Sequence, residues 1–225
     1  MEVIGCSKEG SDGLWYTVHK KKNGMKNKMD EYTSIMLAHN QVCHERRIRK
    51  DQKWKKTVCG YCYSYIQSSV RHQLIKKMER NSEVLRDIAF KPAKIKTING
   101  RLRYISFGDV SSEIEVKNIL KHARYNPTLK KAVWTKMYGL FKNEDLNVKR
   151  MIFIWSCSKI DCLNFVIPKG FNKSFYVFSD KESMKNGMER AKEEGFKVFE
   201  CKLQCNTCNR CYDNQESEII FEVLR

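Results

Sequence analysis

Cysteine spacing is the feature of this chain that points most directly to chemistry. The 225 residues include ten cysteines, and four of them fall close together near the end of the chain as C-x3-C-x2-C-x2-C. These four are Cys201, Cys205, Cys208 and Cys211. Thiolates two residues apart can turn toward one centre, so the spacing favours a metal or an iron–sulfur cluster over a disulfide framework.

A second cysteine group lies early in the chain. Cys59 and Cys62 form a C-x2-C pair, and Cys43 lies sixteen residues before Cys59. Three thiolates leave one iron of a cube-shaped cluster open, or available to a fourth ligand such as His44 or a late cysteine. We predict that early and late cysteines together supply the metal ligands, with Cys59, Cys62 and members of the late group as the leading set.

The late spacing also bears on which metal is bound. The C-x2-C-x2-C run is similar to that of bacterial ferredoxins, although Tyr212 stands where a proline often follows the last cysteine. Structural zinc usually takes two ligand pairs separated by a longer stretch. We therefore predict a [4Fe–4S] cluster and keep zinc as the alternative. The remaining cysteines have no such spacing, and we expect Cys157 to be a small core residue.

The net charge of +17 is the second strong feature. A field of this sign attracts polyanions and accelerates encounter with them. DNA or RNA is therefore the predicted partner, and a host protein is the alternative. A surface that is basic without binding nucleic acid would give the same net charge. No recognition motif accompanies the lysines and arginines, so the charge alone does not distinguish the two cases.

Composition bounds the class of protein. Hydrophobic residues make up 41% and charged residues 31%, as in a globular protein, and no segment resembles a linker. We predict one domain over residues 1–225, with a poorly defined N-terminal extension over 1–40 and a Cys-rich metal-binding segment over 200–216. No apolar run approaches the ~20 residues that cross a bilayer, and no export signal opens the chain. We expect a cytoplasmic protein with reduced thiols and no membrane partner.

Helices and strands alternate from about residue 101 onward. Apolar spacing predicts a long helix or helix pair over 63–89, a helix that Ser111 or Ser112 caps together with Glu115, and another that begins after Asp180. Strands are predicted over 102–107, 131–135, 150–156, 175–178, 196–199 and 218–224, the last of them as an edge strand. This alternation predicts an α/β fold with a mainly parallel sheet or a partial (β/α) barrel.

In parallel α/β folds, binding sites form where the strands end. Gly108, Asp109 and Lys136 each follow a predicted strand, and we predict that they bind a cofactor. Asp109 is the candidate catalytic carboxylate, although an Asp there could equally cap the next helix. Lys136 could bind an anion or could be a surface lysine.

Several of these stretches together resemble the bacteriophage "gene product 88" domain family, whose members are described as radical-SAM-like. The matching stretches are 58–63, 79–85, 103–109, 132–136 and the late cysteines, so that the resemblance spans residues 40–225. It implies a partial-barrel α/β fold, a metallocluster and a phage origin, and hence the cytoplasm of a host cell.

Two departures from the radical SAM pattern concern the cofactor. The signature C-x3-C-x2-C is only half present, because Cys43 is too far from Cys59, and the Gly-Gly-Glu motif is absent. We therefore do not expect S-adenosylmethionine as a cofactor. Two hypotheses remain: an iron–sulfur protein that binds or acts on nucleic acid, or a non-enzymatic basic module stapled by zinc or a cluster.

Overall fold

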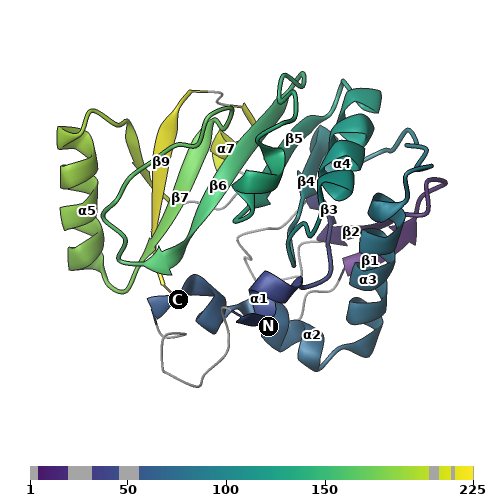
Figure 1. Cartoon of the computed structure of the whole chain (residues 1–225), viewed down its shortest axis with the longest axis horizontal. Helices are drawn as coiled ribbons and strands as arrows, with labels where there is room; N and C mark the ends of the chain where they lie inside the picture. The colour runs from purple at the N-terminus through teal and green to yellow at the C-terminus, as the bar shows by residue number, and fades with distance from the viewer. Residues whose placement is uncertain (1–4, 20–31, 46–55, 203–207, 214–215, 225) are drawn as a thin grey trace.

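A single mixed sheet organises the chain. The computed structural model describes residues 5–19, 32–45, 56–202, 208–213 and 216–224. Within these residues nine strands pair in the order β1-β2-β3-β4-β5-β6-β7-β9-β8 (Figure 1). The strands are β1 (Gly5–Glu9), β2 (Trp15–His19), β3 (Tyr32–Ile35), β4 (Arg101–Tyr104), β5 (Lys130–Thr135), β6 (Met151–Ile160), β7 (Lys173–Phe178), β8 (Val198–Glu200) and β9 (Glu218–Val223).

Strand direction confirms the mainly parallel α/β prediction. β1, β2 and β3 pair antiparallel, and every pairing from β3 to β8 is parallel. The segment predicted as an N-terminal extension thus supplies three strands of the sheet. The predicted edge strand at 218–224 is also corrected, because β9 lies between β7 and β8. Its Ile219, Ile220 and Phe221 are buried, which suits an interior strand covered on both faces.

Helices cover both faces and one end of the sheet. They are α1 (Gln41–Glu45), α2 (Tyr63–Ser69), α3 (His72–Arg86), α4 (Glu113–Tyr125), α5 (Lys181–Glu193) and α7 (Arg210–Asp213), with 3-10 turns η2 (Val58–Tyr61), η3 (Ile98–Gly100) and η4 (Tyr138–Phe141). Figure 1 shows α4 in front of the sheet, α5 at its left-hand end and α7 behind it. It also places α1 and α2 below, at the edge where the parallel strands end.

Apolar side chains that alternate between the two faces of the central strands explain why both faces are covered. Phe153 of β6 and Phe178 of β7 belong to the core clusters on the side of α4 and α5. Ile152, Ile154 and Val177 point to the opposite side, where they form a separate cluster. Successive side chains of a strand alternate between faces, so apolar runs of this kind require a cover on both.

The predicted helix start at Ser111 or Ser112 is confirmed at Ser112. Its side chain accepts from the Glu115 N–H while Glu115 bonds back to the cap, which forms a complete capping box. Val116, Ile119 and Ala123 then bury the inner face of α4. The segment over 63–89 is the helix pair α2 and α3.

Two polar residues of α3 fasten this helix to the first strands. Asn81, which is fully buried, accepts from the Trp15 N–H at 2.6 Å and donates to the carbonyls of Trp15 and Met36 at 3.0 and 2.9 Å. Ser82 accepts from the Ala38 N–H at 3.0 Å. These contacts fix the chain that leaves β3, because each one satisfies a backbone group that would otherwise be buried without a partner.

A buried polar network joins α4 to the strands. The His122 ring lies 2.6 Å from the Tyr104 hydroxyl and 2.9 Å from the Tyr16 hydroxyl, and Tyr16 donates to Asp12 at 2.6 Å. Burial alone would raise the pKa of the Asp12 carboxyl. The hydrogen bonds from His122, Tyr16 and the Leu14 N–H outweigh that effect, so that the pKa lies below its usual value.

Replacing Asp12 by Asn should therefore lower the free energy of unfolding by about 2 kcal/mol near neutral pH. A carboxylate whose pKa is lower in the folded state stabilises the fold above its unfolded pKa, and the contribution disappears as the pH falls through the folded value. Urea unfolding from about pH 7 to about pH 3 should show the wild-type and variant curves converging. Asp145→Asn, at an exposed site, is the control. A difference independent of pH would contradict the assignment.

Candidate metal centre at the carboxyl edge of the sheet

The site begins where β3 and β4 end, because their pairing continues into the following loops. Leu37 N–H donates to the Phe107 carbonyl at 2.9 Å, and Asp109 N–H donates to the Ala38 carbonyl at 3.4 Å. Gly108 lies between them with φ of +67°, and a Cβ atom there would lie 2.0 Å from the Leu37 oxygen. Only glycine permits both this dihedral and this approach.

Asp109 is buried between the ends of β4 and β5. Its carboxylate accepts from the Thr135 hydroxyl at 2.6 Å, from the Lys136 N–H at 2.8 Å and from the Val110 N–H at 2.9 Å. Burial raises the pKa of Asp109, and the charge of Lys136 and these hydrogen bonds counteract the rise. The alternative role as a helix cap is excluded, since Ser112 caps α4.

Asn40 places Cys43 beside this carboxylate. The Asn40 amide donates to the Val110 carbonyl at 2.6 Å, and its oxygen accepts from the Cys43 N–H at 2.9 Å. Burial raises the pKa of the Cys43 thiol to about 12, and the negative charge of Asp109 and the proximity of Cys59 add to the rise, while Lys136 opposes it. Side chains from four separate segments therefore interact here.

The C-x2-C pair sits on a short turn of its own. Thr57 caps η2 by accepting from the Gly60 N–H at 3.2 Å, and Cys62 N–H donates to the Cys59 carbonyl at 3.3 Å. Cys59 is buried and Cys62 is half-buried. An isolated antiparallel bridge between Thr57 and Lys159 holds the turn against β6. The pair is thus fastened to the same edge of the sheet as Asp109.

Histidines flank the cysteines on the α1–α2 side. The His39 ring lies 3.0 Å from the Ser64 hydroxyl, and its centroid lies 6.4 Å from that of His44. Tyr65 contacts both rings, at 5.4 and 6.0 Å between centroids. These rings pack α1 against α2 and so help to position Cys43.

Cys201 and Cys211 of the late group lie on the face of the sheet opposite α4 and α5. Cys201 N–H donates to the Phe221 carbonyl at 2.7 Å, which continues the pairing of β8 with β9. Cys201 and Cys211 pack against the cluster that contains Ile152 and Ile154, and Val58, the neighbour of Cys59, packs against it too. Early and late segments therefore share one apolar cluster.

The part of the late group that lies on α7 is held near the sheet by an ion pair. Cys208 is half-buried, and Cys205 lies outside the described residues. Arg210 of α7 binds the buried Glu218 at 2.8 Å, and Glu218 also pairs with the buried Lys173 at 2.5 Å. This ion network anchors the segment that carries Cys211 to the sheet.

No compact single-ion site forms in the described part of the chain. No three His, Cys, Asp or Glu side chains there are grouped closely enough to hold one metal ion. Among the groups that the sequence identified, Cys59, Asp109 and Lys136 lie close enough to Cys43 to affect the pKa of its thiol. Sequence reasoning missed Asn40, whose only signal was its position just before a short helix that contains Cys43.

Two further results concern the chain as a whole. Among the described helices, none has both the length and the apolar character that crossing a membrane requires. Comparison with protein-family models, with curated proteins and with solved structures gave no match.

Proposed function

We propose that this chain is an iron–sulfur protein whose [4Fe–4S] cluster binds at the carboxyl edge of the sheet, with Cys43, Cys59 and Cys62 as ligands. The observation that carries the proposal is that two sets of contacts place the early cysteines at one edge of the sheet. Asn40 ties Cys43 to the Val110 carbonyl, next to Asp109, and the Thr57–Lys159 bridge ties the turn of Cys59 and Cys62 to β6. Sites of parallel α/β folds form at this edge. The resemblance to radical-SAM-like phage proteins, and the partial barrel it implies, support the same place and a role in an infected host cell.

The donor chemistry fits a cluster better than a single zinc ion. Four thiolates on zinc, with Zn–S of about 2.3 Å, lie only about 3.8 Å apart. The described residues contain no group that compact. In a cluster each thiolate binds a different iron, so the sulfurs stand further apart. Cys59 and Cys62 on one turn, and Cys43 on a separate segment, would each bind a different iron.

The neighbouring residues have definite roles in this proposal. The positive charge of Lys136 favours the thiolate form of Cys43, which is the form that binds iron. Asp109 holds the ends of β4 and β5 together through Thr135 and the Lys136 N–H. When bound, a cluster with three thiolate ligands would supply one open iron to an outside ligand. The ligand role of the late cysteines stays a prediction.

Anaerobic reconstitution of the full chain with iron and sulfide tests this proposal. The protein should develop an absorbance band near 400 nm and retain about four iron and four sulfide per chain after desalting. Zinc added in parallel serves as the competing metal. Tight retention of zinc, together with no retained sulfide, would replace the cluster by the zinc alternative.

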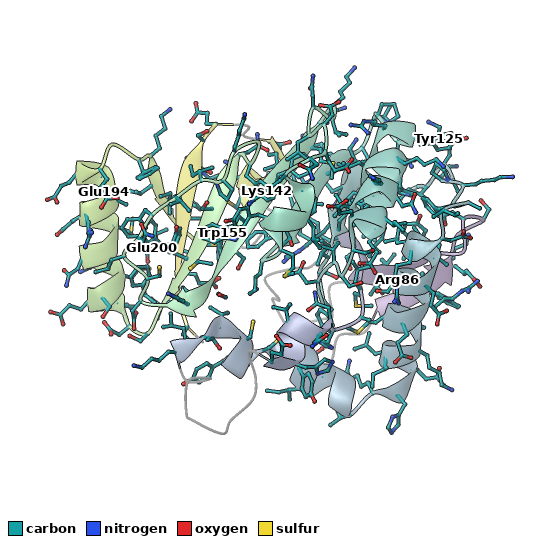
Figure 2. All side chains as sticks on the ribbon, in the orientation of Figure 1. Arg86, Tyr125, Lys142, Trp155, Glu194 and Glu200 are labelled. Carbon is teal, nitrogen blue, oxygen red and sulfur yellow. The ribbon has the colours of Figure 1, made fainter. Side chains whose placement is uncertain are left out.

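Nucleic-acid binding is the second proposal, and the helical face of the sheet supports it. Lysine ammonium groups lie over partly exposed tyrosines, with Lys94 4.6 Å from the Tyr125 ring and Lys142 5.6 Å from the Tyr138 ring. Tyr138 also contacts Trp155 at 5.6 Å between centroids, and Lys142 and Trp155 lie near each other in Figure 2. Exposed aromatic rings among cations are the elements of a single-strand stacking surface.

Single-stranded DNA and RNA should therefore bind with an affinity that falls steeply with salt. Lys142→Ala should weaken binding across sequences and reduce the slope of log K against log salt by about one. Lys192→Ala on α5 is the matched control. Fluorescence anisotropy over a salt series measures both. Equal salt slopes for the two variants would mean that Lys142 does not contact nucleic acid. Binding to an acidic host protein, with no binding to nucleic acid, would favour the non-enzymatic module.

A further inference from the structure

Two cysteines outside the candidate metal centre meet at the end of β6. Cys157 lies within β6 and is buried in a cluster of apolar side chains, and Cys162, which follows the turn at Asp161, packs against the same cluster. The Cys162 thiol is also among the groups that raise the pKa of Cys157. In a straight strand, residues five apart would be separated by about 17 Å. Both cysteines reach one cluster because the pairing of β6 with β7 is irregular between Ser156 and Ile160, and because Asp161 adopts a left-handed φ of 54°.

The surroundings make the two thiols unequal. Cys157 is buried in the cluster that includes Phe165 and Tyr176, whereas Cys162 is half-buried at its margin. The Cys162 sulfur lies 3.9 Å from the Asn164 carbonyl, and the Tyr176 hydroxyl donates to the same carbonyl at 3.0 Å. Burial raises the pKa of Cys157 to about 11. Cys162 is consequently the thiol that an outside reagent reaches first.

We propose that Cys157 and Cys162 form a redox-active dithiol that closes to an intrachain disulfide by exchange with a low-molecular-weight disulfide such as oxidised glutathione. The Cys162 thiolate attacks one sulfur of the reagent, forms a mixed disulfide and releases one glutathione thiolate. The Cys157 sulfur then attacks the Cys162 sulfur and releases the second glutathione. Two protein thiols are oxidised, one reagent disulfide is reduced, and the two thiol protons pass to the two glutathione thiolates.

The position of the pair gives the disulfide a structural consequence. The six-residue segment that it would close contains Lys159, and Lys159 forms the bridge to Thr57. Thr57 in turn caps the turn that carries Cys59 and Cys62. A rearrangement of residues 158–161 on oxidation therefore acts directly on the turn that holds the proposed cluster ligands.

Trypsin provides a sharp test, because cleavage after Lys159 separates the two cysteines. Metal-free full-length protein is equilibrated in glutathione buffers of graded ratio, remaining thiols are alkylated, and non-reducing digests are analysed by mass spectrometry. Peptides 151–159 and 160–169, with one cysteine each, should become linked as the oxidised fraction rises, and dithiothreitol should separate them. Because no iron is present, the result does not depend on the cluster proposal.

Single variants supply the matched controls. Cys162→Ser should abolish the linked peptide and leave Cys157 largely reduced, because the buried thiol is poorly accessible. Cys157→Ser should leave Cys162 as a mixed disulfide with glutathione. Circular dichroism of each variant serves as the control for folding. The proposal is overturned if both cysteines remain alkylatable in wild-type protein across the whole series, or if Cys162 pairs with another cysteine instead.

Discussion

Protein carrying Cys59→Ser should retain little or no iron after anaerobic reconstitution, whereas the wild type retains about four iron per chain. A serine hydroxyl stays protonated at neutral pH and is a poor iron ligand, so loss of one thiolate opens the cluster to hydrolysis. Cys43→Ser and Cys62→Ser should behave alike, because all three residues are proposed ligands. Iron and sulfide analysis after desalting measures the effect.

Late-group variants make this result interpretable. Cys208→Ser and Cys211→Ser change the same chemical group in the late segment, whose Cys211 packs against the cluster that contains Ile152 and Ile154. They should keep their iron if the early trio holds the cluster. Urea unfolding of the metal-free variants distinguishes ligand loss from unfolding, since each single change should cost no more than about 1 kcal/mol. Iron loss in the late variants alone would mean that Cys201, Cys205, Cys208 and Cys211 are the cluster ligands.

Gly108→Ala should destabilise the metal-free protein by more than about 3 kcal/mol. Two effects combine at this position: a φ of +67° that favours glycine, and a Cβ that would lie 2.0 Å from the Leu37 oxygen and 2.4 Å from the Ala38 oxygen. Relief requires the 105–110 loop to leave the chain that follows β3. Asp109 and Cys43 would then separate, so iron retention should fall as well.

Gly100→Ala isolates the first of these effects, the positive φ. Gly100 has nearly the same dihedral, φ of +65°, but no atom lies within 4 Å of its hypothetical Cβ. This variant should lose only the left-handed backbone term of about 1–2 kcal/mol. Urea midpoints of the two variants compare directly. Equal losses would mean that the close approach of the two loops contributes nothing to stability.

How far the sequence predicts the fold depends on whether the signal is local. The α4 helix was predictable because Ser112, Glu115 and the apolar spacing are all within the segment. β3 was missed because it buries polar residues whose partners are distant: Ser106 donates to Ser34 at 3.0 Å, and the Ile98 N–H donates to Thr33 at 3.1 Å. The interior place of β9 is likewise set by long-range pairing.

The candidate site divides in the same way. Strand ends predicted that Asp109 and Lys136 would lie at one edge, and the structure joins them there through the hydrogen bond from the Lys136 N–H to Asp109. The contribution of Asn40 could not be predicted, because it depends on the Val110 carbonyl, seventy residues away in the chain. The proximity of Cys157 and Cys162 was missed for a related reason, since their spacing gave no signal and the irregular pairing of β6 with β7 could not be predicted from the segment itself.

Locating iron in crystals of the anaerobically reconstituted protein tests the central claim most directly. Anomalous difference maps recorded on either side of the iron absorption edge should show a compact peak bonded to the Cys43, Cys59 and Cys62 sulfurs, next to Asp109 and Lys136. Iron bonded only to the late cysteines, or a peak that appears at the zinc edge instead, would contradict the account.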